Sequence, residues 1–135
     1  MQAEEDGHPL KLIYPDDYGV HMYADTIFTS DALIANNPAL VSRFLNATLQ
    51  GWNYVVIHPE EAGALSLLYD PKLNSGHEVN AMKASLPLIY TGKTKIGAMD
   101  TLIWSGMQDI LFENGLPKER VTIADVFTTR FINGQ

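Results

Sequence analysis

The sequence predicts a helix-rich α/β fold that has few strands of its own. The 135 residues are 46% hydrophobic, which is enough to build a packed core. Two short segments near the start have strand character, whereas the rest of the chain carries helix caps and helical apolar spacing. Two strands make a poor sheet by themselves. We therefore expect the chain to be one portion of a larger fold.

The N-terminal segments are predicted as a tail and two strands. Residues 1–9 are acidic and end in proline, which is typical of a tail. Residues 10–14 form the first candidate strand, and a turn follows at residues 16–19. Residues 20–28 alternate, so that His21, Tyr23 and Asp25 share one face. The opposite face has core character and consists of Val20, Met22, Ala24, Thr26 and Phe28.

The remaining elements are predicted as helices from caps, prolines and apolar spacing. The longest begins at Pro38 after the cap residue Asn37, and its apolar stripe continues over about five turns. Within this stripe we expect four side chains to be buried together, namely Phe44, Leu45, Leu49 and Trp52. Asp100 is expected to cap the last helix, and Gly115 to follow its end. Further helical segments are predicted at residues 31–35, 59–68, 75–85, 101–114 and 123–127.

Charge and composition exclude several classes of partner and chemistry. Nine Lys and Arg against sixteen Asp and Glu give a net charge of −7, which disfavours nucleic acid and anionic membrane surfaces. No apolar run approaches the roughly 20 residues that span a bilayer, so we expect no direct membrane insertion. The absence of cysteine removes disulfides, thiolate metal sites and cysteine nucleophiles.

The sequence carries no catalytic or metal-binding motif. It lacks the glycine-rich nucleotide loops, the paired-histidine zinc motif and the serine-nucleophile motif, and its four histidines stand singly. We therefore predict no catalytic residue, no metal ligand and no cofactor. This pattern favours a binding protein over an enzyme.

One cluster has the composition of a binding surface, and its members are Tyr18, His21, Tyr23 and Asp25. Aromatic rings can stack on a flat ligand, and a carboxylate can accept a hydrogen bond or balance a cation. The solvated face of an edge strand has the same composition, so the residues alone leave both interpretations open. Trp52 and Trp104 fall on helix faces, which favours core positions for both.

Several strings of the sequence, in this order and spacing, resemble one protein family. They are DYGVHMYADTIFTS at residues 17–30, NPALVSRFLNATLQGW at 37–52, HPEEA at 58–62, LPLIY at 86–90, and the segment from Met99 to Trp104. The resemblance covers about residues 12–130. It is to the periplasmic substrate-binding proteins of ABC importers, in the group that binds nitrate, sulfonates, taurine, thiamine pyrimidine precursors or riboflavin.

The resemblance implies a two-lobed periplasmic-binding-protein fold of type II, with the ligand held in the cleft between the lobes. Residues 10–29 would be hinge-crossing strands, and residues 30–135 the helical C-terminal part of lobe one, so that 10–135 form a single domain or a fragment of one. The cluster of Tyr18, His21, Tyr23 and Asp25 would then face or flank the cleft. Because the rest of lobe one is missing from this match, we expect exposed apolar surface and self-association into a homo-oligomer.

The function implied is capture of a small molecule for the membrane permease of an ABC importer. The implied location is periplasmic or extracytoplasmic, with a signal peptide or lipid anchor outside these residues. Asp25 would repel an oxyanion, so a neutral heteroaromatic ligand such as a thiamine-type pyrimidine is favoured. Its ring could stack on Tyr23 and its exocyclic amine could donate to Asp25. Two alternatives remain open at this point, a thiamine pyrimidine synthase-like enzyme and a sensory ligand-binding module of a signalling protein.

Overall fold

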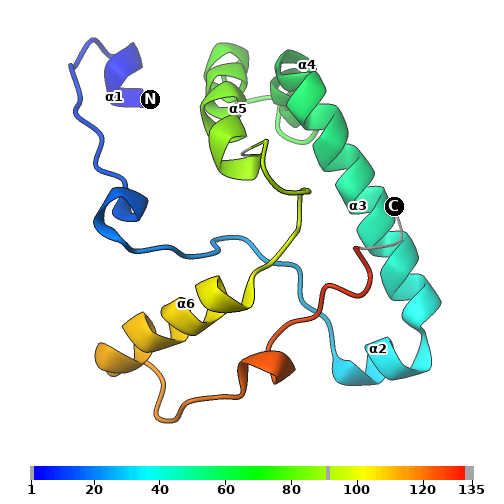
Figure 1. Cartoon of the computed structure of the whole chain (residues 1–135). Helices are drawn as coiled ribbons and strands as arrows, with labels where there is room; N and C mark the ends of the chain where they lie inside the picture. Colours follow the sequence, from blue (N-terminus) through cyan, green and yellow to red (C-terminus); the bar gives the residue numbers. More distant parts are fainter. Residues whose placement is uncertain (1, 91, 133–135) are drawn as a thin grey trace. The chain divides into compact units, whose positions relative to one another are not determined.

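The computed structural model describes residues 2–90 and 92–132, and helices are its main regular structure (Figure 1). The α-helices are α1 (Gln2–Glu5), α2 (Asp31–Asn36), α3 (Pro38–Ile57), α4 (Pro59–Leu65), α5 (Ser75–Ile89) and α6 (Thr101–Glu113). Short 3₁₀ helices are η1 (Pro15–Tyr18), η2 (Ser66–Leu68) and η3 (Ile123–Asp125). The helix-rich part of the predicted fold class is therefore confirmed. The two-lobed architecture remains a prediction.

Both predicted strands are wrong. None of the described residues lies in a β-strand, and residues 10–14 and 20–28 have no regular structure outside a bend. A strand needs a neighbour to pair its backbone N–H and C=O groups, and the described chain gives neither segment such a neighbour. The N–H of Tyr23 instead donates to the sulfur of Met107, at 3.3 Å. Alternation of side chains is thus insufficient for a strand where a pairing partner is missing.

The predicted helix starts are confirmed by side-chain caps. Asn37 accepts a hydrogen bond from the N–H of Leu40 at 3.2 Å, and Pro38 is the first residue of α3. Asp100 likewise accepts from the N–H of Leu102 at 2.7 Å, at the start of α6. Such caps satisfy backbone donors that have no partner inside the helix. Gly115 follows α6 with a φ of +71°, a conformation that glycine adopts without strain.

Two predicted helix ends differ from the structure. Helix α5 was expected to stop before Pro87, yet it continues to Ile89 with the proline inside its last turn. Proline removes only one backbone donor there, so the turn can close around it at the cost of one hydrogen bond. The turn expected at residues 123–127 is shorter, because the 3₁₀ helix η3 ends at Asp125 and Thr122 supplies no side-chain cap. Helix ends are therefore less well predicted than helix starts.

The chain folds as two compact units. Unit 1 comprises Met1–Lys11 and Asn46–Gly97, and unit 2 comprises Leu12–Leu45 and Ala98–Gln135. Helix α3 contributes its first turns to unit 2 and its remaining turns to unit 1. None of the described helices is both long and apolar enough to cross a membrane. The expected limits of a tail at 1–9 and a domain at 10–135 remain a prediction.

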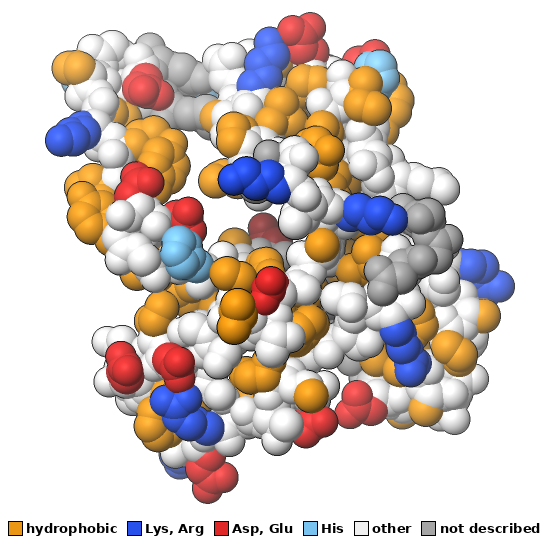
Figure 2. All heavy atoms as spheres, viewed as in Figure 1, with side chains coloured by type: hydrophobic (Ala, Val, Ile, Leu, Met, Phe, Trp, Pro, Cys, Tyr) orange, Lys and Arg blue, Asp and Glu red, His pale blue; other side chains and the backbone are white. Residues whose placement is uncertain are grey.

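The buried apolar core of the described chain is small and consists of Leu49, Ala62 and Ile132. The expected cluster on α3 is only partly formed. Leu49 is 3% exposed, but Phe44 is 60% exposed. Helix α3 is about 30 Å long and α4 about 10 Å, so the short helix that follows α3 cannot cover its whole apolar stripe. Apolar side chains accordingly appear across the face drawn in Figure 2.

Candidate ligand-binding site

Tyr23 is the one member of the predicted binding cluster that is packed against a helix. Its ring lies 5.6 Å from that of Trp104, and its hydroxyl oxygen accepts a hydrogen bond from the N–H of Asp100 at 2.8 Å. Trp104 in turn stacks on Phe127 at 5.5 Å but is half-buried, so its predicted core position is only partly confirmed. Tyr23 therefore holds the irregular segment 20–28 on α6 within unit 2.

The other three members of the cluster are exposed. Tyr18 ends η1 and is 74% exposed, His21 pairs through Nδ1 with the Asp16 carboxylate, and Asp25 lies at a bend. No hydrogen bond, ion pair or ring contact joins any two of the four residues, all of which the structure describes. Their shared role as a ligand wall stays a prediction.

The predicted core face of segment 20–28 is wrong. Phe28 is 92% exposed and Met22 is also exposed, whereas Tyr23 from the opposite face is the side chain that packs. Without a strand, the side chains no longer alternate between two faces. The side chain that contacts α6 is instead Tyr23, which has a large ring and a hydroxyl that forms a hydrogen bond.

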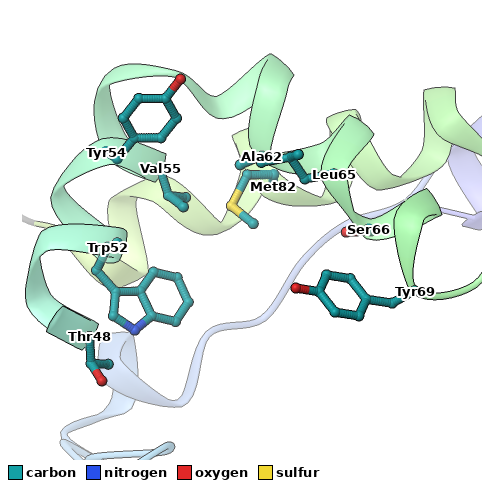
Figure 3. A pocket seen from close by; sticks show the side chains of 10 residues that line it. Thr48, Trp52, Tyr54, Val55, Ala62, Leu65, Ser66, Tyr69 and Met82 are labelled. Atoms are coloured by element: carbon teal, nitrogen blue, oxygen red, sulfur yellow. The ribbon is translucent and has the colours of Figure 1, made fainter. Parts of the chain in front are cut away.

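Unit 1 contains an open cavity of about 440 Å³ that the sequence did not suggest (Figure 3). Helix α3 forms one side, and α4, η2 and α5 form the remainder. The lining residues are Thr48, Gly51, Trp52, Tyr54, Val55, Ala62, Leu65, Ser66, Tyr69 and Met82. This volume falls within the range of small-molecule sites, roughly 300–1,000 Å³.

The close packing of α4 on α5 builds the floor of the cavity. Gly63 makes this possible, because a Cβ added there would lie 2.6 Å from both the Cα and the N of Val79. Only a residue without a side chain allows the two backbones to approach so closely. The neighbouring Ala62 is consequently buried, and it lines the cavity together with Met82 of α5.

Tyr54 is held in the cavity wall by α4. Its hydroxyl donates to the Glu61 carboxylate, and its ring lies 4.4 Å from that of His58. The hydrogen bond to Glu61 raises the pKa of Tyr54, and partial desolvation and the negative charge of Glu61 act in the same direction. In Figure 3 the Tyr54 hydroxyl points away from the lining side chains. Tyr54 therefore offers the cavity its ring rather than its polar group.

An ion pair joins α4 and α5 beside the floor. Lys83 Nζ donates to Glu60 Oε1 at 2.8 Å, which lowers the pKa of Glu60 from its usual 4.5. A carboxyl group with a lowered folded-state pKa stabilises the fold above its unfolded pKa, and this contribution is lost as the pH falls through the folded value. The contribution is small, because both side chains are exposed.

We therefore expect Lys83→Gln to lower the free energy of unfolding slightly near neutral pH, and to have a vanishing effect once the pH falls well below 4.5. Denaturant unfolding at a series of pH values measures this difference. Lys72→Gln is the matched control, since only the backbone N–H of Lys72 is bonded, to Asp70. A destabilisation by Lys83→Gln that is the same at every pH would contradict the ion-pair assignment.

The lining of the cavity is uncharged and partly aromatic. None of the ten described residues that line it carries a charged side chain, and three of them are aromatic. Within the described residues, no group of three or more His, Asp or Glu is placed to hold a metal ion. The side chains that line the cavity therefore offer ring contacts and hydrogen bonds from hydroxyl groups and the indole N–H of Trp52.

Sequence reasoning assigned Trp52 to a core, and the structure shows it 39% exposed at the cavity. The available signal was Gly51, because a glycine on an apolar helix leaves a space beside the helix, and Gly51 also lines the cavity. Tyr69 gave no signal, since it follows η2 and reaches the cavity only through tertiary packing.

Comparisons with known proteins identify related sequences. Residues 1–62 match the family model described as NMT1/THI5 like. Over 120 residues the chain is 31% identical to a protein of Chloroflexus aurantiacus named riboflavin-binding protein RibY. That alignment covers 84% of this chain and 34% of the relative, so the chain spans about a third of the length of the protein it matches. No solved structure matches the chain.

Proposed function

Because this chain belongs to the NMT1/THI5-like family of substrate-binding proteins, we propose that it takes part in capturing an uncharged heteroaromatic solute for an ABC importer. The observation that carries the proposal is the relative that is named as a riboflavin-binding protein. The isoalloxazine ring of riboflavin and a thiamine-type pyrimidine share this chemistry, since both are flat, neutral nitrogen heterocycles. Riboflavin is the ligand to test first.

The charge of the predicted binding segment supports a neutral ligand. Residues 12–42 contain four aspartates and neither lysine nor arginine. Recognition of nitrate or a sulfonate needs positive charge or converging N–H donors, whereas Asp25 would repel an anion. The exposed Asp25 carboxylate can instead accept a hydrogen bond from a ring N–H or an exocyclic amine.

The proposed activity is binding without chemistry. The relative is named for binding, and these 135 residues contain none of the catalytic motifs considered above. In this proposal a membrane permease receives the ligand, and the protein acts in the periplasm or another extracytoplasmic space. Closure of the lobes around the ligand would give an open, ligand-free state and a closed, ligand-bound state, and the importer would recognise the closed one.

Calorimetric titration with riboflavin, a thiamine-type aminopyrimidine and an alkyl sulfonate tests the ligand class. We expect a heteroaromatic ligand to bind and the sulfonate not to bind. We also expect Asp25→Asn to weaken heteroaromatic binding, because the carboxylate is the stronger acceptor.

Asp31→Asn is the matched control, as it removes the same charge from the exposed first turn of α2. Sulfonate binding that Asp25→Asn leaves unchanged would contradict the proposed ligand. Binding of the heteroaromatic that both variants leave unchanged would remove Asp25 from the site.

A further inference from the structure

We propose that the cavity of unit 1 is itself a binding site for one flat, uncharged aromatic ring, held between Trp52 and Tyr69. All ten residues that line this cavity belong to unit 1, so it is a second candidate site, distinct from the exposed Asp25 of unit 2 that the proposed function places at the ligand. The choice of riboflavin as the test ligand rests on the function proposed above. The geometry of the cavity is independent of that choice.

Two rings form opposite sides of the site. In Figure 3 the indole of Trp52 extends from α3 and the phenol of Tyr69 extends toward it from beyond η2. Tyr69 is 92% exposed and Trp52 is 39% exposed, so both still have a large apolar surface in water. A flat ring placed between them would remove this surface from water and would meet aromatic groups on either side.

The floor is apolar and is held by close packing. Ala62 and Met82 line it, and α4 packs closely against α5 at Gly63, where an added Cβ would lie 2.6 Å from backbone atoms of Val79. A methionine thioether is polarisable and makes favourable contacts with aromatic rings. The floor is therefore held in place without a ligand, and it offers an apolar, polarisable surface to a bound aromatic ring.

Polar groups lie among the lining residues without adding charge. Ser66 supplies a hydroxyl group, Tyr69 a phenolic hydroxyl and Trp52 an indole N–H. Such groups can meet the nitrogen and carbonyl edge of a heterocycle. A charged ligand would lose hydration without gaining an ion pair among these described lining residues. The site is thus matched to a neutral heterocycle.

Riboflavin titration of three variants tests the assignment, with quenching of flavin fluorescence and calorimetry as readouts. Tyr69→Ala removes one ring from a side chain that is already exposed, so it should leave the fold intact. Gly51→Leu adds a side chain at the mouth, where an added Cβ meets nothing within 4 Å. We expect each change to raise the Kd for riboflavin at least tenfold. Circular dichroism and thermal melts verify that both variants remain folded.

Leu68→Ala is the matched control, because Leu68 is 77% exposed and next to Tyr69 but does not line the cavity. It should change the Kd less than about twofold. Riboflavin binding that Tyr69→Ala and Gly51→Leu both leave unchanged would overturn this inference and leave the proposed function standing. If the wild-type chain binds no flat heterocycle at all, this site is wrong, because every residue that lines it lies within the chain.

Discussion

Replacing Leu49 with alanine is expected to lower the free energy of unfolding by about 2–5 kcal/mol. Leu49 is 3% exposed and is the most deeply buried of the three apolar core residues of the described chain. The truncation removes buried methyl groups and leaves a cavity that the surrounding helices can only partly close. Chemical denaturation followed by circular dichroism measures the loss.

Leu68→Ala provides the same chemical change at an exposed position of the same unit, and it should cost far less. Leu45, which is half-buried, should give an intermediate value. Equal losses for Leu49→Ala and Leu68→Ala would mean that unit 1 has no unique core. Such a result would remove the structural basis for the cavity beside α3.

Gly63→Ala is expected to lower the free energy of unfolding by about 1–3 kcal/mol. The new methyl group would lie 2.6 Å from backbone atoms of Val79, a distance at which α4 and α5 must move apart. The effect is informative because alanine normally stabilises a helix relative to glycine by roughly 1 kcal/mol. In denaturant unfolding, a lower free energy of unfolding for Gly63→Ala indicates the close contact with Val79. A higher value indicates that helix propensity dominates.

Gly51→Ala is the matched control, since it lies inside α3 and an added Cβ meets nothing within 4 Å. It should raise stability where Gly63→Ala lowers it. If Gly63→Ala were also stabilising, the contact between α4 and α5 would be looser than the structure shows. The floor of the proposed ring site would then be loose as well.

The helices could be predicted because their starting signals are local. Ser30 and Asp100 cap helices through hydrogen bonds to N–H groups within three residues, and Pro59 opens α4 at its first position. Each of these signals acts over a single turn, so no tertiary contact is needed to recognise it. The continuation of α5 through Pro87 shows that helix ends depend on context as well.

The strands could not be predicted because pairing is not local. Residues 20–28 alternate as a strand would, but a strand also needs a neighbour that the described chain does not provide. The segment is instead held on α6 by the Tyr23 ring, which contacts Trp104, and by the Tyr23 hydroxyl, which accepts a hydrogen bond from the N–H of Asp100. Its N–H bond to Met107 joins residues 84 positions apart, a separation that no short motif encodes.

The candidate site was predictable only in part. Aromatic and acidic side chains at Tyr18, His21, Tyr23 and Asp25 suggested a ligand surface, which stays a prediction, and the structure adds that the Tyr23 ring and hydroxyl contact α6 and its cap residue. The cavity beside Trp52 depends on the packing of α4 against α5 at Gly63 and Val79, which both lie outside the helix that carries Trp52. Sequence spacing along one helix contains no information about such a contact.

The most direct test of the proposed function is equilibrium dialysis of the 135-residue chain against riboflavin, with an alkyl sulfonate dialysed in parallel. We expect saturable retention of riboflavin that moderate salt does not weaken, because a neutral ligand gains nothing from exposed charges. We expect no retention of the sulfonate. Retention of the sulfonate without riboflavin, falling as salt is added, would show an anion site and contradict capture of an uncharged heteroaromatic solute.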